Sequence, residues 1–143
     1  MSNNLVSDWM TPQPITIPTN CLLRDAYWLM IEHNVRRLPV LEGECLVGIV
    51  TLEDVRRIEP PTGFGLDLVK ITKMLSKMTV SQIMTRDPRT IASDAPLIEA
   101  ARMMLEYKIS TLPVVSGSHL VGIITESDIF QAFVELETEK LMP

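Results

Sequence analysis

The sequence has few of the groups that would commit it to secretion or to a membrane. Only two of its 143 residues are cysteines, and Cys21 and Cys45 stand outside any CxxC or Cys/His group. Isolated thiols are typical of a reducing compartment, so we predict reduced cysteines in a cytoplasmic protein. No apolar run approaches the ~20 residues that cross a bilayer, and the first residues lack the basic and apolar regions of a signal peptide.

Basic charge and catalytic fingerprints are also scarce. The chain has 13 basic and 18 acidic residues, which produce a net charge of -5 and no general attraction for nucleic acid or anionic lipid. His33 and His119 have no neighbouring acid or cysteine that would complete a metal site. No GxGxxG, P-loop, GxSxG, HExxH or EF-hand pattern occurs, so the sequence indicates a protein that is not an enzyme and requires no cofactor.

The chain does contain an internal repeat. When the sequence is shifted by 74 positions, residues 6–57 align with residues 80–131 without a gap, and 21 of the 52 pairs are identical. We call these segments copy one and copy two. At 46% hydrophobic and 22% charged residues, the composition is that of a packed globular protein. Each copy is too small to close a core alone, so the two are expected to share one.

Each copy predicts a β-α-β-β-α unit. A short Val-Ser-x-x-Met turn leads to an extended Thr-Ile pair, and apolar residues at helical spacing follow. In copy two, Asp94 is the predicted N-cap of this helix, with Pro96 in its first turn. Two short apolar runs predict strands joined by a glycine turn, over residues 38–41 and 46–50 in copy one. A last helix begins at Thr51 or Thr125, and the copies are predicted to pack about a pseudo-twofold axis.

The predicted boundaries place the first domain at residues 1–60, a linker with a helix at 61–79, and the second domain with a C-terminal helix at 80–143. Two prolines and two glycines within residues 59–65 break regular structure. Residues 66–78 then predict an amphipathic helix, and residues 128–141 predict the C-terminal one. Either helix could cover a subunit interface or pack within its own chain, and both alternatives stay open.

The repeated motifs resemble those of the CBS domain. They are Met-Thr-x-x-Pro-x-Thr-Ile, then Leu-Pro-Val, then Leu-Val-Gly-Ile followed by Val or Ile and Thr-x-x-Asp, twice over nearly the whole chain. Paired CBS domains form a Bateman module, and this chain resembles the stand-alone bacterial type. The resemblance implies an α+β fold of two βαββα units, a homodimer, and a regulatory adenosine ligand: AMP, ADP, ATP, S-adenosylmethionine or a dinucleotide.

The Thr-x-x-Asp motifs have two interpretations. An ionised carboxylate can accept both hydroxyls of a ribose, while the threonine hydroxyl and the free amides of a helix start suit phosphate. The same spacing is that of a capping box, in which the acid supports its own helix. The resemblance favours the ligand interpretation for Thr51, Asp54, Thr125 and Asp128, and the threonines could serve both purposes.

The resemblance further implies two sites, each combining residues of both copies. One would contain Ile15, Thr16, Ile17, Arg36 and Arg37 with Thr125 and Asp128. The other would contain Arg89, Thr90, Ile91, Ser110 and Thr111 with Thr51 and Asp54. Arginine offers forked cationic donors where copy two has neutral hydroxyls, so the Arg36-Arg37 site is expected to favour the more charged ligand. A solvated surface charge is the alternative for this pair.

Ligand level would be reported by a conformational or oligomeric change acting on a regulated protein that the sequence does not identify. Two other classes of function stay open. One is a structural dimerisation module that holds no ligand. The other is weak nucleic-acid binding, for which Lys70, Lys73 and Lys77 on one face of the predicted helix are the only support.

Overall fold

The computed structural model describes residues 4–58, 73 and 76–141, and within them the chain forms two compact units. The first-copy unit comprises residues 15–88, and the second-copy unit comprises residues 1–14 together with residues 89–143. The amphipathic helix predicted for residues 66–78, including Lys70, lies almost entirely outside the described residues. None of the described helices combines the length and apolar character that a bilayer-spanning segment requires.

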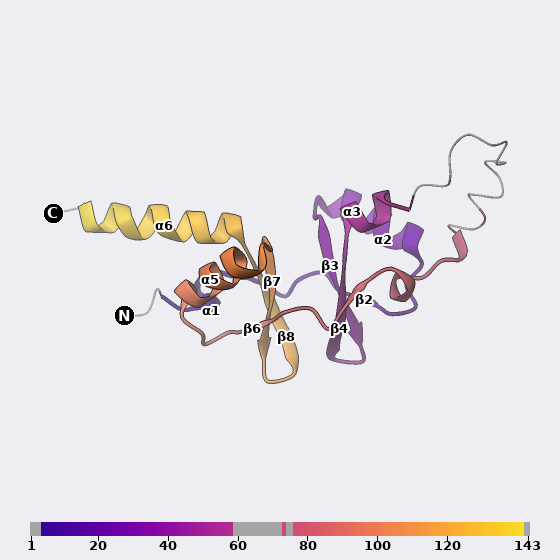
Figure 1. Ribbon diagram of the computed structural model, residues 1–143, viewed down its shortest axis with the longest axis horizontal. Coiled ribbons are helices and arrows are strands. Elements are labelled where there is room, and N and C mark those ends of the chain that lie inside the picture. Colours follow the sequence, from indigo (N-terminus) through magenta and orange to yellow (C-terminus); the bar gives the residue numbers. More distant parts are fainter. Residues whose placement is uncertain (1–3, 59–72, 74–75, 142–143) are drawn as a thin grey trace. The chain divides into compact units, whose positions relative to one another are not determined.

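The first-copy unit is built on a hairpin of two strands, with one helix before the hairpin and another directly after it (Figure 1). Strand β2 pairs in parallel with β3, β3 pairs antiparallel with β4, and β4 pairs antiparallel with the short β5. Its elements are β2 (Ile17–Pro18), α2 (Leu23–His33), β3 (Arg37–Glu42), β4 (Cys45–Thr51), α3 (Leu52–Arg56), the 3-10 turn η1 (Val80–Gln82) and β5 (Thr85–Arg86).

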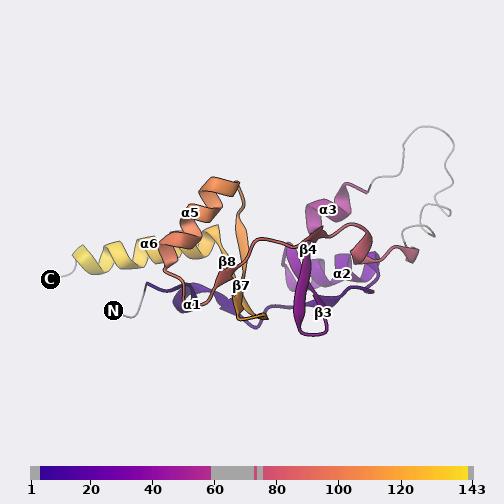
Figure 2. The ribbon, with the colours of Figure 1, turned by 60° about the horizontal axis from the view of Figure 1, so that its bottom comes forward.

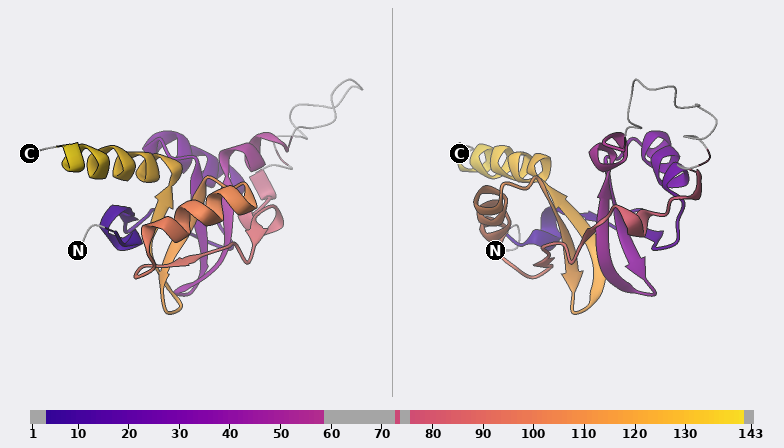
Figure 3. Two further views of the ribbon diagram at one scale, coloured as in Figure 1. Left: turned by 60° about the vertical axis from the view of Figure 1, so that its left-hand side comes forward. Right: turned by 45° about the vertical axis from the view of Figure 1, so that its right-hand side comes forward.

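The second-copy unit repeats this plan, with a longer last helix (Figure 3). Strand β6 pairs with β7, β7 with β8, and β8 with β1. Its elements are α1 (Val6–Trp9), β1 (Thr11–Pro12), β6 (Ile91–Ala92), α5 (Leu97–Tyr107), β7 (Thr111–Ser116), β8 (His119–Thr125) and α6 (Glu126–Leu141). The predicted strands, their glycine turns and the helices after Thr51 and Thr125 are confirmed, and the turn glycines Gly43 and Gly117 have φ near +62° and +63°.

The segment that leads each copy packs in the unit of the other copy. Figure 2 shows α1, coloured indigo, beside the second-copy hairpin. The amide of Leu97 donates to the carbonyl of Asn4 at 2.6 Å, and the equivalent Leu23 amide donates to the Met78 carbonyl at 2.8 Å. The compact units therefore follow a different division of the chain from the two sequence copies.

These exchanged carbonyls correct one sequence prediction. Asp94 does not cap α5, because the N-cap residue is Pro96 and no side chain bonds to the helix start. The main-chain carbonyl of Asn4 satisfies a first-turn amide instead. A carbonyl supplied by a distant segment has no local sequence signature, so the pattern around Asp94 was misleading.

The two cores are nearly the same. In the first-copy unit Leu38, Val40 and Val50 have no exposed surface, and in the second-copy unit the equivalent Leu112, Val114 and Ile124 have none either. The methionine of each Met-Thr motif packs against a glycine of the central strand, Met84 against Gly48 in β4 and Met10 against Gly122 in β8. A β-carbon added at Gly48 would lie 2.5 Å from the Met84 sulfur, and one added at Gly122 would lie 2.5 Å from the Met10 sulfur.

Candidate ligand-binding clusters

Thr51 and Asp54 form a capping box at the start of α3. The Asp54 amide donates to Thr51 Oγ1 at 3.0 Å, and the Thr51 amide donates to Asp54 Oδ2 at 3.0 Å. The capping interpretation of the first Thr-x-x-Asp motif is therefore correct for this structure. The box uses only one carboxylate oxygen, since Oδ1 of Asp54 faces the Arg57 guanidinium at 3.9 Å.

Thr125 and Asp128 repeat this arrangement with looser geometry. The Thr125 amide donates to Asp128 Oδ2 at 2.9 Å, whereas the Asp128 amide donates to Thr125 Oγ1 at 3.4 Å. The threonine hydroxyl also donates to Asp128 Oδ2 at 3.2 Å. Within the described residues, Oδ1 of Asp128 has no hydrogen-bond or ion-pair partner, so half of this carboxylate remains open to a hydroxyl donor.

Arg36 and Arg37 lie beside the first capping box, where β3 begins. Arg37 is opposite Thr51 in the register of β3 and β4, and the Leu52 amide donates to the Arg36 carbonyl at 2.8 Å. The Arg36 guanidinium is bonded to the Glu53 carboxylate, on the first turn of α3. The hydrogen bond from Arg36 lowers the pKa of Glu53 below its ordinary value, with smaller contributions from the charges of both arginines.

Ser110 and Thr111 occupy the same place in the second-copy unit. Thr111 is opposite Thr125 in the register of β7 and β8, and the Glu126 amide donates to the Ser110 carbonyl at 3.0 Å. Thr111 is buried, and among the described residues its Oγ1 is the one buried side-chain oxygen or nitrogen without a hydrogen-bond partner. A buried hydroxyl without a partner is costly, which makes Thr111 a place where a bound group would be stabilising.

Arg89 packs on an aromatic ring that sequence reasoning missed. Its guanidinium carbon lies 3.4 Å from the centre of the Tyr107 ring, at the end of α5. Tyr107 lies three residues before Ser110, so this contact brings Arg89 to the cluster around β7. A tyrosine at the helix end just before two predicted ligand residues was the available signal, and Glu53 beside Asp54 was another.

The Thr-Ile pairs contribute mainly to the core. Ile17 is 4% exposed in β2 and Ile91 is 5% exposed in β6, each packed among core residues of its own unit. Their side chains are therefore occupied within the core, while Ile15, Thr16 and Thr90 are partly exposed in the extended segments before them. Any contact of these segments with a ligand would come from the main chain or from these partly exposed side chains.

Within each unit the structure thus brings together one set of predicted residues. We call Arg36, Arg37, Thr51 and Asp54 with Glu53 the first cluster, and Arg89, Ser110, Thr111, Thr125 and Asp128 with Tyr107 the second cluster. The predicted combination of residues from both copies into each site stays a prediction.

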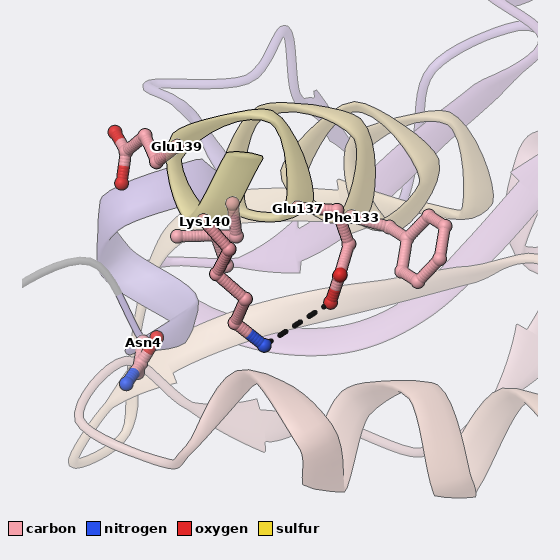
Figure 4. A pocket seen from close by; sticks show the side chains of 6 residues that line it. Asn4, Phe133, Glu137, Glu139 and Lys140 are labelled. Atoms are coloured by element: carbon pink, nitrogen blue, oxygen red, sulfur yellow. Dashed lines mark hydrogen bonds and ion pairs between the residues drawn. The ribbon is translucent and has the colours of Figure 1, made fainter. Parts of the chain in front are cut away.

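The second-copy unit also has two grooves. One, of about 420 Å³, is lined by apolar residues of α5 and α6 together with Asn4. The other, of about 440 Å³, lies along the end of α6 beside Asn4, where Figure 4 shows Lys140 reaching Glu137. The helices also carry exposed apolar side chains, namely Ile98, Leu105, Phe130, Phe133 and Val134. None of the predicted ligand residues lines either groove.

A duplicated α+β fold, with a Thr-Asp capping box where a strand meets a helix in each copy, defines the class of protein. The CBS domain family matches residues 6–60 and 80–135, and this chain therefore belongs to the CBS domain family as a tandem pair. The predicted fold class is confirmed.

Relatives extend this likeness. An inosine-5'-monophosphate dehydrogenase from Korarchaeum cryptofilum is 38% identical over 117 residues, which are 81% of this chain and 21% of that enzyme. The chain spans only 21% to 24% of the length of the first curated relatives that it matches.

Two solved structures of CBS pairs contain adenosyl ligands. CBSX2 from Arabidopsis thaliana in complex with AMP is 30% identical, with a TM-score of 0.76 over 94% of this chain and 98% of that one. The CBS pair of protein MJ0100 in complex with 5'-methylthioadenosine and S-adenosylmethionine is 32% identical, with a TM-score of 0.74 over 92% and 96% of the two chains.

Proposed function

We propose that this chain is a regulatory module, not an enzyme, that binds an adenosine nucleotide or a related adenosyl ligand at the two clusters. The similarity to CBS pairs solved with AMP or S-adenosylmethionine carries the proposal. The clusters support it chemically, because each combines an aspartate carboxylate with hydroxyl or guanidinium donors at the start of a helix. AMP, ADP and ATP are the proposed ligands.

The capping boxes are compatible with this function. Each carboxylate uses Oδ2 for its helix, so Oδ1 of Asp128 can accept a ribose hydroxyl without breaking the box. At Asp54 the hydroxyl would share Oδ1 with the exposed Arg57 guanidinium, 3.9 Å away. The buried Thr111 hydroxyl also gains a partner when a polar ligand group reaches it. The second cluster therefore has both an acceptor and a donor that no other group among the described residues uses.

The test is a thermal-unfolding panel with adenosine, AMP, ADP, ATP and S-adenosylmethionine, with GMP as a control for the base. A ligand at 100 times its dissociation constant should stabilise the fold by about 2.7 kcal/mol, so melting temperature should rise with concentration. Asp54→Asn and Asp128→Asn should each weaken binding at one cluster while keeping the side-chain volume. Unchanged melting temperatures across the panel would favour the ligand-free dimerisation module and contradict the proposal.

We further propose that the apolar surface of α5 and α6 is covered by a second copy of the chain. Phe130, Phe133 and Val134 are each at least 60% exposed on one helix, a cluster that a monomer would leave in water. Phe133→Glu should convert a dimer into monomers in native mass spectrometry, whereas Glu135→Gln on the same helix should not. The same spectra report any co-purified nucleotide, and a monomeric wild type would refute the dimer.

Signalling then requires a difference in affinity between two states of the module, since a ligand shifts only an equilibrium that it binds unequally. The regulated protein would recognise one of these states. A nucleic-acid target is the remaining alternative, and the excess of acid over base argues against it. A gel shift that weakens steeply with salt would be needed to support it.

A further inference from the structure

Each cluster holds one arginine by a partner that the other copy lacks. Arg36 is paired with Glu53, and copy two has serine at both equivalent positions, Ser110 and Ser127. Arg89 is stacked on Tyr107, and copy one has isoleucine and histidine there, Ile15 and His33. Arg36 and Arg89, one cation from each cluster, are therefore held in chemically different ways.

The Glu53 carboxylate neutralises Arg36. Both side chains are partly exposed, at 57% for Arg36 and 42% for Glu53, so the pair can open toward a ligand. A phosphate that replaces Glu53 on the guanidinium must break this pair and then lie near the displaced negative charge. The net attraction of the first cluster for phosphate is reduced accordingly.

The Tyr107 ring holds Arg89 without neutralising it. A guanidinium stacks on a ring through its face, which leaves the N–H groups at its edge able to donate. Among the described residues no carboxylate is paired with Arg89. Since the ring also restricts the side chain, less conformational entropy is lost when a phosphate binds.

We propose that Glu53 and Tyr107 set the phosphate selectivity of the two clusters. Glu53 makes the first cluster favour an uncharged or singly phosphorylated adenosyl ligand, and Tyr107 presents Arg89 to a di- or triphosphate at the second. This inference rests on the proposed function. It orders the clusters opposite to the sequence-based expectation, in which the Arg36-Arg37 pair attracts the more charged ligand.

The test is titration calorimetry with adenosine and ADP as probes, at fixed low salt and without divalent cations. The Arg89→Ala background isolates the first cluster. There, Glu53→Gln should tighten ADP binding about fivefold, the equivalent of an exposed ion pair, and change adenosine binding less than twofold. Glu137→Gln removes the carboxylate of another exposed ion pair, with Lys140, and should change neither ligand.

The second cluster is tested by Tyr107→Leu and Tyr107→Phe in the Arg36→Ala background. The leucine variant should bind ADP about threefold more weakly and adenosine with unchanged affinity. The phenylalanine variant should keep the wild-type ratio of ADP to adenosine affinity, because the ring remains. Circular dichroism melts confirm that each variant is folded.

The outcomes separate the two proposals. If adenosine binds but Glu53→Gln and Tyr107→Leu leave the ratio of ADP to adenosine affinity unchanged, the selectivity inference is wrong while the proposed function stands. If neither adenosine nor ADP binds the wild type, both proposals fail. If the increase in ADP affinity caused by Glu53→Gln becomes smaller as salt is added, the effect of Glu53 on ADP binding is electrostatic.

Discussion

The two units share almost the same buried framework and differ in what surrounds their predicted ligand residues. Ala26 and Val40 are fully buried in the first-copy unit, and Ala100 and Val114 are fully buried at the equivalent positions of the other. At the end of each hairpin, however, an ion pair in one unit stands where the other has serines. Packing demands the same shapes twice, whereas exposed positions around the clusters are free to diverge.

The largest expected effect tests the shared framework. Gly48→Ala and Gly122→Ala should each destabilise the fold by about 1–3 kcal/mol, because the new β-carbon would overlap a methionine side chain and press on a main-chain carbonyl. Chemical denaturation measures both. The two losses should agree within about 0.5 kcal/mol if the units are equivalent there. If only one of the two substitutions lowers the stability, the two units are not equivalent at this position.

The capping boxes should differ in strength. Thr51→Ala is expected to cost about 1–2 kcal/mol, because both reciprocal bonds are 3.0 Å long. Thr125→Ala should cost nearer 0.5 kcal/mol, since the bond from the Asp128 amide is 3.4 Å long. Urea unfolding of both variants, with Thr→Ser at each position as control, measures the difference. The reverse order would show that bond length does not determine the contribution.

Thr111→Val should stabilise the ligand-free protein by about 1 kcal/mol, because it replaces an unpaired buried hydroxyl with a methyl of similar size. The same variant should bind ADP more weakly if this hydroxyl contacts the ligand. Thermal melts with and without ADP measure the two effects, and Thr125→Val, which removes a bonded hydroxyl, is the control for the stability effect alone. A destabilised Thr111→Val protein would mean that the hydroxyl has a partner in solution.

The smallest effect is the pH dependence contributed by Glu53. Arg36 lowers the pKa of Glu53 in the folded protein below its ordinary value of 4.5, so the ionised carboxylate favours folding. This stabilisation is complete above about pH 4.5 and is lost as the pH falls through the lowered value. Exposed pairs contribute at most about 1 kcal/mol. The stability difference between wild type and Glu53→Gln, measured in urea at several pH values, should vanish in acid.

The repeat made much of the fold predictable from sequence. The alternation of apolar runs and turn glycines located β3, β4, β7 and β8, and the Thr-x-x-Asp spacing located the starts of α3 and α6. Local signals were sufficient there, because strand pairing across a short turn and helix capping involve residues close in sequence. The prediction at Asp94 failed because the group that bonds the Leu97 amide is the carbonyl of Asn4, 93 residues earlier in the chain.

The candidate clusters were only partly visible in the sequence. Arg36, Arg37, Ser110 and Thr111 were recognisable by their place before Leu-Pro-Val, and the structure places them beside the capping boxes of their own units. Neither the Glu53 carboxylate on Arg36 nor the Tyr107 ring under Arg89 was anticipated. Such contacts depend on side-chain directions that a repeat alignment does not contain.

By itself the sequence determined the duplication, the order of strands and helices, and the family, because periodicity and motif spacing are properties of the chain. Only the tertiary structure decided that the lead segment of each copy packs in the unit of the other copy. It also decided that Arg36 is held by a carboxylate and Arg89 by an aromatic ring. These are contacts between segments far apart along the chain, selected by packing and hydrogen bonding in three dimensions.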